Sequence, residues 1–138
     1  MQKLTTKELL AMPGSEYMDV AQLSFFKHLL LQKQAETRER MEQARTALGE
    51  LENPPDLLDL GSVELQRTLT LSTISRSNLA LHDIDKALAR ISEETYGYCE
   101  MDGAEIGLER LLANPTAIYS TYSQQWVEAR QATVRRSA

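Results

Sequence analysis

Two aspartates in the middle of the chain are the residues whose type and spacing are most able to do chemistry. Asp56 and Asp59 lie in the segment Pro54-Pro55-Asp56-Leu57-Leu58-Asp59-Leu60-Gly61. They are ordinary turn and helix-capping residues if the leucines pack as a small cap. They form a docking tip if the leucines stay exposed, because a pair of carboxylates can contact a metal ion or a basic group of a partner. These residues alone leave both interpretations open.

Other chemically versatile side chains are few. Cys99 is the only cysteine and His28 and His82 are the only histidines, so an internal disulfide is excluded and soft metal ligands are scarce. The sequence has no glycine-rich phosphate loop and no nucleophile elbow. Ser75, Ser120 and Ser123 have no neighbouring histidine that could activate them as nucleophiles. We therefore expect a protein that is not an enzyme.

Charge and hydropathy exclude further classes. Residues 92–115 hold six carboxylates and only Arg110 as a cation, so their charge of −5 equals the net charge of all 138 residues. Such a field disfavours direct binding to nucleic acid. The longest apolar run is four residues, Leu9–Met12, too short for a membrane span, and the first residues do not resemble an export signal. We expect a cytoplasmic monomer.

Two long helices must position the aspartates. Residues 20–52 lack proline and are rich in helix formers, and Asp19 with Gln22 predicts a capping box at the start. A narrow apolar seam follows, with polar Gln34 and Thr37 in its middle. A second helix is expected over about 62–92, with a seam at Leu71, Ile74, Asn78, Leu81, Ile84, Leu88 and Ile91.

Asn53-Pro54-Pro55 must end the first helix, so the two helices are expected to form an antiparallel hairpin with arms of about 45 Å. Turn-rich residues follow from position 93, then a short helix and a final helix to about Arg136. The predicted fold is therefore predominantly all-α: an N-terminal segment (1–17) that packs with the body, a coiled-coil hairpin (18–92) with its tip at 53–61, and a small body with a C-terminal helix (93–138). The body's apolar area is expected from Tyr96, Tyr98, Tyr119, Tyr122, Trp126 and Met101.

Three stretches carry fixed residues at fixed spacing: Glu16-Tyr17-Met18, Pro55-Asp56-x-x-Asp59, and Tyr96-Gly97-Tyr98-Cys99-Glu100-x-x-Gly103-x-Glu105-Ile106-Gly107-x-x-Arg110-Leu111-x-Ala113-x-Pro115-Thr116-Ala117. In them the chain resembles the DksA/TraR family, over about residues 15–131. The resemblance implies a bacterial protein that binds RNA polymerase and inserts its hairpin into the secondary channel, where the tip alters transcription initiation, for example at ribosomal RNA promoters. The tip residues it implies are Asp56, Asp59, Leu60 and Gly61, with glycine where the family has alanine.

The same resemblance implies a four-cysteine zinc finger, whose ligand positions here are Cys99, Asp102, Ser120 and Ser123. Serine is a very poor zinc ligand, so we expect a degenerate, metal-free finger in which hydrogen bonds replace the metal. In this respect the chain is similar to the zinc-independent DksA paralogues.

Family members also help to form a site for the stringent-response alarmone ppGpp with basic residues. The matching positions here hold Asp83, Asn114 and Gln124, while Arg76 remains as a phosphate contact, so we expect a weakened response to ppGpp. Two alternatives stay open: a transcript-cleavage factor of the Gre kind, whose tip carboxylates hold a catalytic Mg²⁺ in the polymerase, and a structural coiled-coil adaptor.

Overall fold

Helices make up the regular structure of the chain. The computed structural model describes residues 4–52 and 60–137, and the elements in them are α1 (Thr6–Ala11), the short 3₁₀ helix η1 (Gly14–Glu16), α2 (Val20–Glu52), α3 (Leu60–Ser92), α4 (Leu108–Ala113) and α5 (Thr121–Ser137). A single isolated antiparallel bridge joins Tyr98 and Glu105 within this part of the chain. The predicted all-α hairpin fold is confirmed, with the second helix beginning two residues earlier than expected. No helix among the described residues has the length and apolarity to span a membrane.

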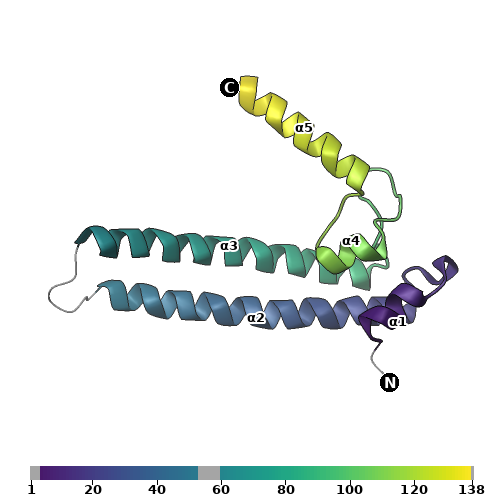
Figure 1. The fold of residues 1–138 in the computed structure, drawn as a ribbon, viewed down its shortest axis with the longest axis horizontal. Coiled ribbons are helices and arrows are strands. Elements are labelled where there is room, and N and C mark those ends of the chain that lie inside the picture. The colour runs from purple at the N-terminus through teal and green to yellow at the C-terminus, as the bar shows by residue number, and fades with distance from the viewer. Residues whose placement is uncertain (1–3, 53–59, 138) are drawn as a thin grey trace. The chain divides into compact units, whose positions relative to one another are not determined.

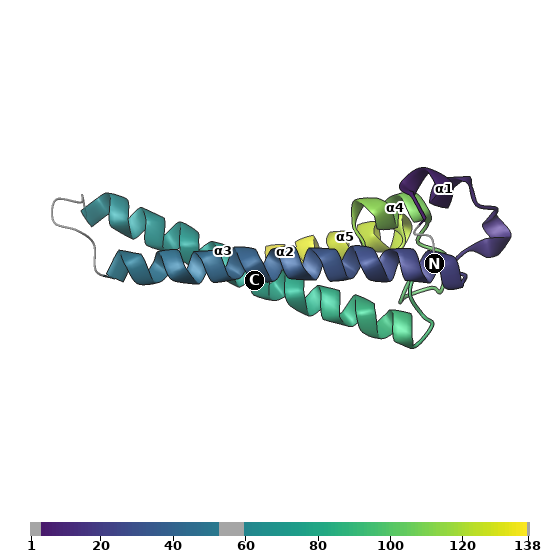
Figure 2. The ribbon, with the colours of Figure 1, turned by 90° about the horizontal axis from the view of Figure 1, so that it is seen from below.

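The chain divides into two compact units, and α2 and α3 each contribute residues to both. One unit, the end unit, combines the beginning of the chain up to Leu30 with the residues from Ala87 onward. The other, the hairpin unit, is Leu31–Lys86, in which the second part of α2 and the first part of α3 lie side by side in opposite directions (Figure 1). In the end unit, α1, α4 and the start of α5 gather around the first turns of α2 and the last turns of α3 (Figures 1 and 2).

The predicted capping box at the start of α2 is present. The Asp19 carboxylate accepts a hydrogen bond from the Gln22 backbone N–H at 2.9 Å, and the Gln22 side-chain oxygen accepts one from the Met18 N–H at 2.9 Å. Gln22 is fully buried, and its bond with the Met18 N–H is shielded from water, whereas its bond with Asp19 is only part-buried. They fix the direction in which the chain enters α2.

The inner seam of α2 in the hairpin unit is the predicted one. Thr37, Met41 and Ala44 are buried there. The two polar residues in its middle find partners: the Thr37 hydroxyl donates to the Lys33 carbonyl at 2.7 Å, and the Gln34 amide donates to Asp85 of α3 at 3.0 Å. The polar interruption of the seam is thus satisfied within the hairpin.

The inner seam of α3 differs from the prediction in its first half. Leu71 and Asn78 are exposed, whereas Val63, Ser77 and Ile84 are buried. These three buried residues belong to one heptad series, in which 63, 70, 77 and 84 are seven positions apart, and this series continues to Ile91. The buried residue at the centre of this series, Ser77, is small.

The core of the end unit is built from residues distant in sequence. Leu9, Phe26, Tyr96, Ile106 and Leu111 are all buried. The Phe26 and Tyr96 rings pack with centroids 5.5 Å apart, and the Tyr96 hydroxyl donates a buried hydrogen bond of 2.7 Å to the Pro115 carbonyl.

The expected aromatic core is therefore only partly correct. Tyr96 is central to it, but Tyr122, Trp126 and Met101 are exposed. The rest of the apolar area comes from Ile106 and Leu111 of the body, and from Leu9 and Phe26, which lie outside residues 93–138. Trp126 on α5 carries the Arg130 guanidinium 5.2 Å from its ring centroid, as a cation–π pair.

Candidate functional site

The predicted tip lies at the connection of α2 to α3. Asp56 and Asp59 fall outside the described residues, so their role stays a prediction. Leu60 and Gly61 are the first two residues of α3, and Leu60 is 78% exposed. An apolar side chain at this exposure is available to a partner.

The four positions that match the family's zinc ligands come together in the end unit. The Asp102 carboxylate accepts hydrogen bonds from the Ala104 N–H at 3.0 Å and from the Ser123 hydroxyl at 3.4 Å. The Ser120 hydroxyl accepts from the Ser123 N–H at 3.2 Å, which caps the start of α5. Cys99 is buried beside them, and its side chain is hydrogen-bonded to Asp102.

Hydrogen bonds set the ionisation of this cluster. Burial raises the pKa of the Cys99 thiol, but hydrogen bonds from the Ser123 hydroxyl and from backbone N–H groups of residues 101, 102 and 120 outweigh it and leave the pKa lowered. The pKa of exposed Asp102 is also lowered, first by the Ala104 N–H and then by Cys99. Both groups are stabilised as anions by the donors that surround them.

These residues do not fit a structural zinc site. Zinc in such sites takes four nitrogen or sulfur ligands, whereas this cluster offers one thiol, one carboxylate and two hydroxyls. Both hydroxyls already make the hydrogen bonds given above. Elsewhere in residues 4–52 and 60–137, no group of three or more histidine, cysteine, aspartate or glutamate side chains is placed to hold a metal ion.

Tyr17 is a connecting residue whose role the sequence did not reveal. Its hydroxyl donates to the Gly97 carbonyl at 2.6 Å and accepts from the Gly107 N–H at 2.9 Å, across 80 and 90 residues of sequence. Its ring also meets that of Tyr98 edge-on at 5.6 Å. Burial raises the pKa of Tyr17, and the Gly107 N–H partly offsets the effect. Tyr17 therefore fixes the N-terminal segment to the turns around Cys99.

Gly97 is required at this junction. Its φ of +90° is in the region that favours glycine, and an added Cβ would lie 2.7 Å from Cγ of Met18. The close approach brings the Gly97 carbonyl to the Tyr17 hydroxyl.

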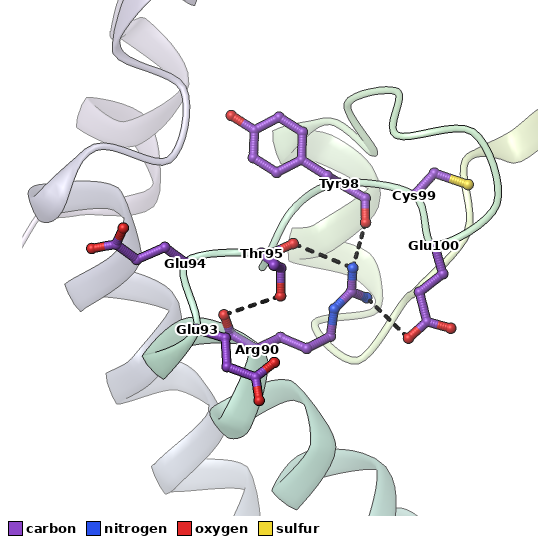
Figure 3. A pocket seen from close by; sticks show the side chains of 7 residues that line it. All are labelled: Arg90, Glu93, Glu94, Thr95, Tyr98, Cys99 and Glu100. Atoms are coloured by element: carbon purple, nitrogen blue, oxygen red, sulfur yellow. Dashed lines mark hydrogen bonds and ion pairs between the residues drawn. The ribbon is translucent and has the colours of Figure 1, made fainter.

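Arg90 organises the other side of the same turns, in a pocket of about 460 Å³ (Figure 3). Its guanidinium donates to the carbonyls of Thr95 at 3.2 Å and Tyr98 at 2.6 Å, and it lies 3.9 Å from the Glu100 carboxylate. Glu93 and Glu94 also line the pocket, which makes the surroundings of Arg90 acidic. With its guanidinium occupied by loop carbonyls, Arg90 serves to hold residues 95–100 against the end of α3.

The residues matched to the alarmone site are on different elements. Arg76 and Asp83 are exposed on α3 in the hairpin unit, whereas Asn114 follows α4 and Gln124 is in α5, both in the end unit. The Gln124 amide donates to Glu128 at 3.0 Å, and Asn114 accepts from the Thr116 hydroxyl at 3.0 Å. Neither side chain supplies a positive charge.

Known proteins are similar to this chain in sequence and in fold. Residues 22–91 match the family described as DnaK suppressor protein DksA, N-terminal domain. The RNA polymerase-binding transcription factor DksA of Caulobacter vibrioides is 41% identical over 116 residues, which cover 83% of this chain and 82% of that protein. The protein of the same name from Escherichia coli K12 is 37% identical over 106 residues, covering 76% and 70%.

A solved structure of a related protein has a similar fold. Transcription factor DksA2 from Pseudomonas aeruginosa superimposes with a TM-score of 0.83 at 41% identity, over 93% of this chain and 99% of that one. On sequence and on structure alike, the chain belongs to the DksA family.

Proposed function

We propose that this chain binds bacterial RNA polymerase, inserts the tip of its hairpin into the secondary channel, and modulates transcription initiation, for example at ribosomal RNA promoters. The observation that carries the proposal is the hairpin of α2 and α3, whose connecting segment retains both aspartates of the family's tip. Relatives at 37% and 41% identity bear the name RNA polymerase-binding transcription factor. The acidic body supports contact with a protein partner over contact with DNA. In this proposal the chain acts in the cytoplasm as a monomer.

We further propose that the protein works without zinc. Hydrogen bonds among Cys99, Asp102, Ser120 and Ser123 occupy the positions where the family's finger binds its metal. A body held in this way keeps its shape when zinc is scarce or when oxidants attack thiolates.

The experiment that tests both proposals is transcription in vitro from a ribosomal RNA promoter with purified polymerase, in the presence of a chelator. The intact protein should alter initiation, and the Asp56→Asn/Asp59→Asn variant should bind polymerase without this effect. Equal action of both proteins would show that the aspartates have no role at the tip and would favour the structural adaptor. Rescue of backtracked complexes by cleavage, dependent on the two aspartates, would favour the Gre-like alternative.

The response to ppGpp is proposed to be weak. Asp83, Asn114 and Gln124 replace cationic donors, and Arg76 alone keeps a positive charge for a phosphate. Titration of ppGpp into the same assay should give little further change. Potentiation as large as that of a DksA with basic residues at these positions would contradict the proposal.

A further inference from the structure

The outward side of α3 carries a second, unpartnered seam. Leu65, Leu69 and Leu79 are 61%, 58% and 64% exposed. Together with Ser72 and Arg76 they recur at gaps of four, three, four and three residues, which places them along one stripe of the helix. We call Leu65, Leu69 and Leu79 the leucine seam. It lies opposite the inner seam of Val63, Ser77 and Ile84, so it takes no part in holding the hairpin together.

The two arms of the hairpin unit differ sharply in surface charge. The α3 arm has charged side chains at Asp83, Asp85 and Lys86 near its end, but its first 22 residues, 60–81, contain only three, against nine in residues 31–52 of α2. The three are Glu64, Arg67 and Arg76. Burial of the charged arm against a partner would require the desolvation of many ions, and burial of the leucine arm would require almost none.

Repeated exposed leucines on one face of a helix are typical of a surface that binds a partner. Apolar residues at heptad spacing complement a second helix or an apolar groove, and contiguous apolar patches mark interaction surfaces. The stripe also starts close to the proposed tip, because Leu65 lies only four residues after Gly61 in the same helix. A surface that docks here would be continuous with one that contacts the tip.

We propose that the leucine seam lies against an apolar, helical surface of RNA polymerase, while the charged face of α2 stays in water. The inference rests on the proposed function, since it names the face of the hairpin that the polymerase covers.

The test compares affinities for purified RNA polymerase core enzyme, measured by interferometry with the full chain immobilised. The seam variant is L65Q/L69Q/L79Q, in which glutamine keeps helix propensity and removes apolar area. The matched control is A35Q/E39Q/T46Q, at exposed positions of α2. The Asp56→Asn/Asp59→Asn variant tests whether binding to polymerase is independent of the aspartates that are proposed to alter initiation. Circular dichroism checks that all variants keep the parent's helicity and melting temperature.

The seam variant should bind polymerase at least tenfold more weakly than the parent, which corresponds to about 1.4 kcal/mol. The control and the aspartate variant should bind as the parent does. Equal binding by the parent and the seam variant overturns the inference and leaves the proposed function intact, whereas failure of the parent to bind removes the proposed function itself. A parent that sediments as a dimer, together with a monomeric seam variant of unchanged polymerase affinity, would assign the seam to a second copy of the chain and overturn the inference.

Discussion

The hydroxyl of Tyr17 allows one long-range contact of the end unit to be measured by itself. In Tyr17→Phe the ring and its edge-on contact with Tyr98 remain, while the bonds to the Gly97 carbonyl and the Gly107 N–H are lost. A typical hydrogen bond contributes about 1 kcal/mol net, and a partner left unsatisfied costs about 1–3 kcal/mol. Since Tyr17 is only half-buried and water reaches part of the site, we expect a loss of about 2 kcal/mol.

Urea unfolding provides the measurement. Fluorescence of Trp126, which is in the same unit, follows the end unit, and circular dichroism follows all helices. With a slope of about 2 kcal/mol per molar urea, the midpoint should fall by roughly 1 M. Tyr122→Phe is the matched control, because Tyr122 is exposed, and it should leave the midpoint unchanged. A loss below about 0.5 kcal/mol for Tyr17→Phe would refute the reasoning.

The pH dependence of stability in the parent and in Tyr17→Phe gives a second check. Burial raises the pKa of Tyr17 above its usual 10.0, so the hydroxyl stays protonated in the folded state at a pH where it ionises in the unfolded chain. Its stabilisation is therefore complete below pH 10 and is lost as the pH rises above 10. The difference between parent and Tyr17→Phe should narrow above pH 10. Burial also raises the pKa of Tyr96, which is present in both proteins, and in the parent alone Tyr17 adds a smaller part to that rise.

Two further predictions concern the same unit. Gly97→Ala should lower the free energy of unfolding by about 2 kcal/mol or more, because the new methyl group meets Met18 and the φ of Gly97 is unfavourable for alanine. Gly103→Ala is the control, because Gly103 also has a positive φ but no close neighbour, and it should cost less. Equal losses of stability in thermal melts of the two variants would contradict the steric argument. Ser123→Ala removes the donor to Asp102 and should destabilise by about 1 kcal/mol, whereas a chelator should leave the melting temperature of the parent unchanged. A drop in melting temperature on chelation would show that a metal supports the fold.

Local signals in the sequence were enough to predict the hairpin. Helix formers without proline, the Asp19–Gln22 cap and the paired prolines define α2 and its end. The register of α3 was harder to predict, because its leucines recur at more than one helical spacing and Leu71 is as apolar as an inner seam requires, whereas Ser77 is not. Only the partner helix decides that Ser77 faces inward and that Leu65, Leu69 and Leu79 do not.

The body shows a different limit of sequence reasoning. The cluster of Cys99, Asp102, Ser120 and Ser123 could be predicted because the resemblance supplied the spacing. The contacts of Tyr17 with Gly97 and Gly107 could not, because nothing local links residues so far apart in the sequence. Aromatic content alone also misplaced the core, since Trp126 lies on an exposed face of α5 and Phe26 of α2 takes the inner position beside Tyr96.

The division of the chain into two units has a consequence for synthesis on the ribosome. Residues 31–86 are contiguous, so both arms of the hairpin unit are available for pairing as soon as α3 has emerged. The end unit instead joins Tyr17 to Gly97 and Gly107 and Phe26 to Tyr96, and these contacts cannot form until the chain has been made beyond α3. A premature stop after α3 therefore yields a chain that holds the tip and both arms but lacks every residue of the body that Tyr17 binds.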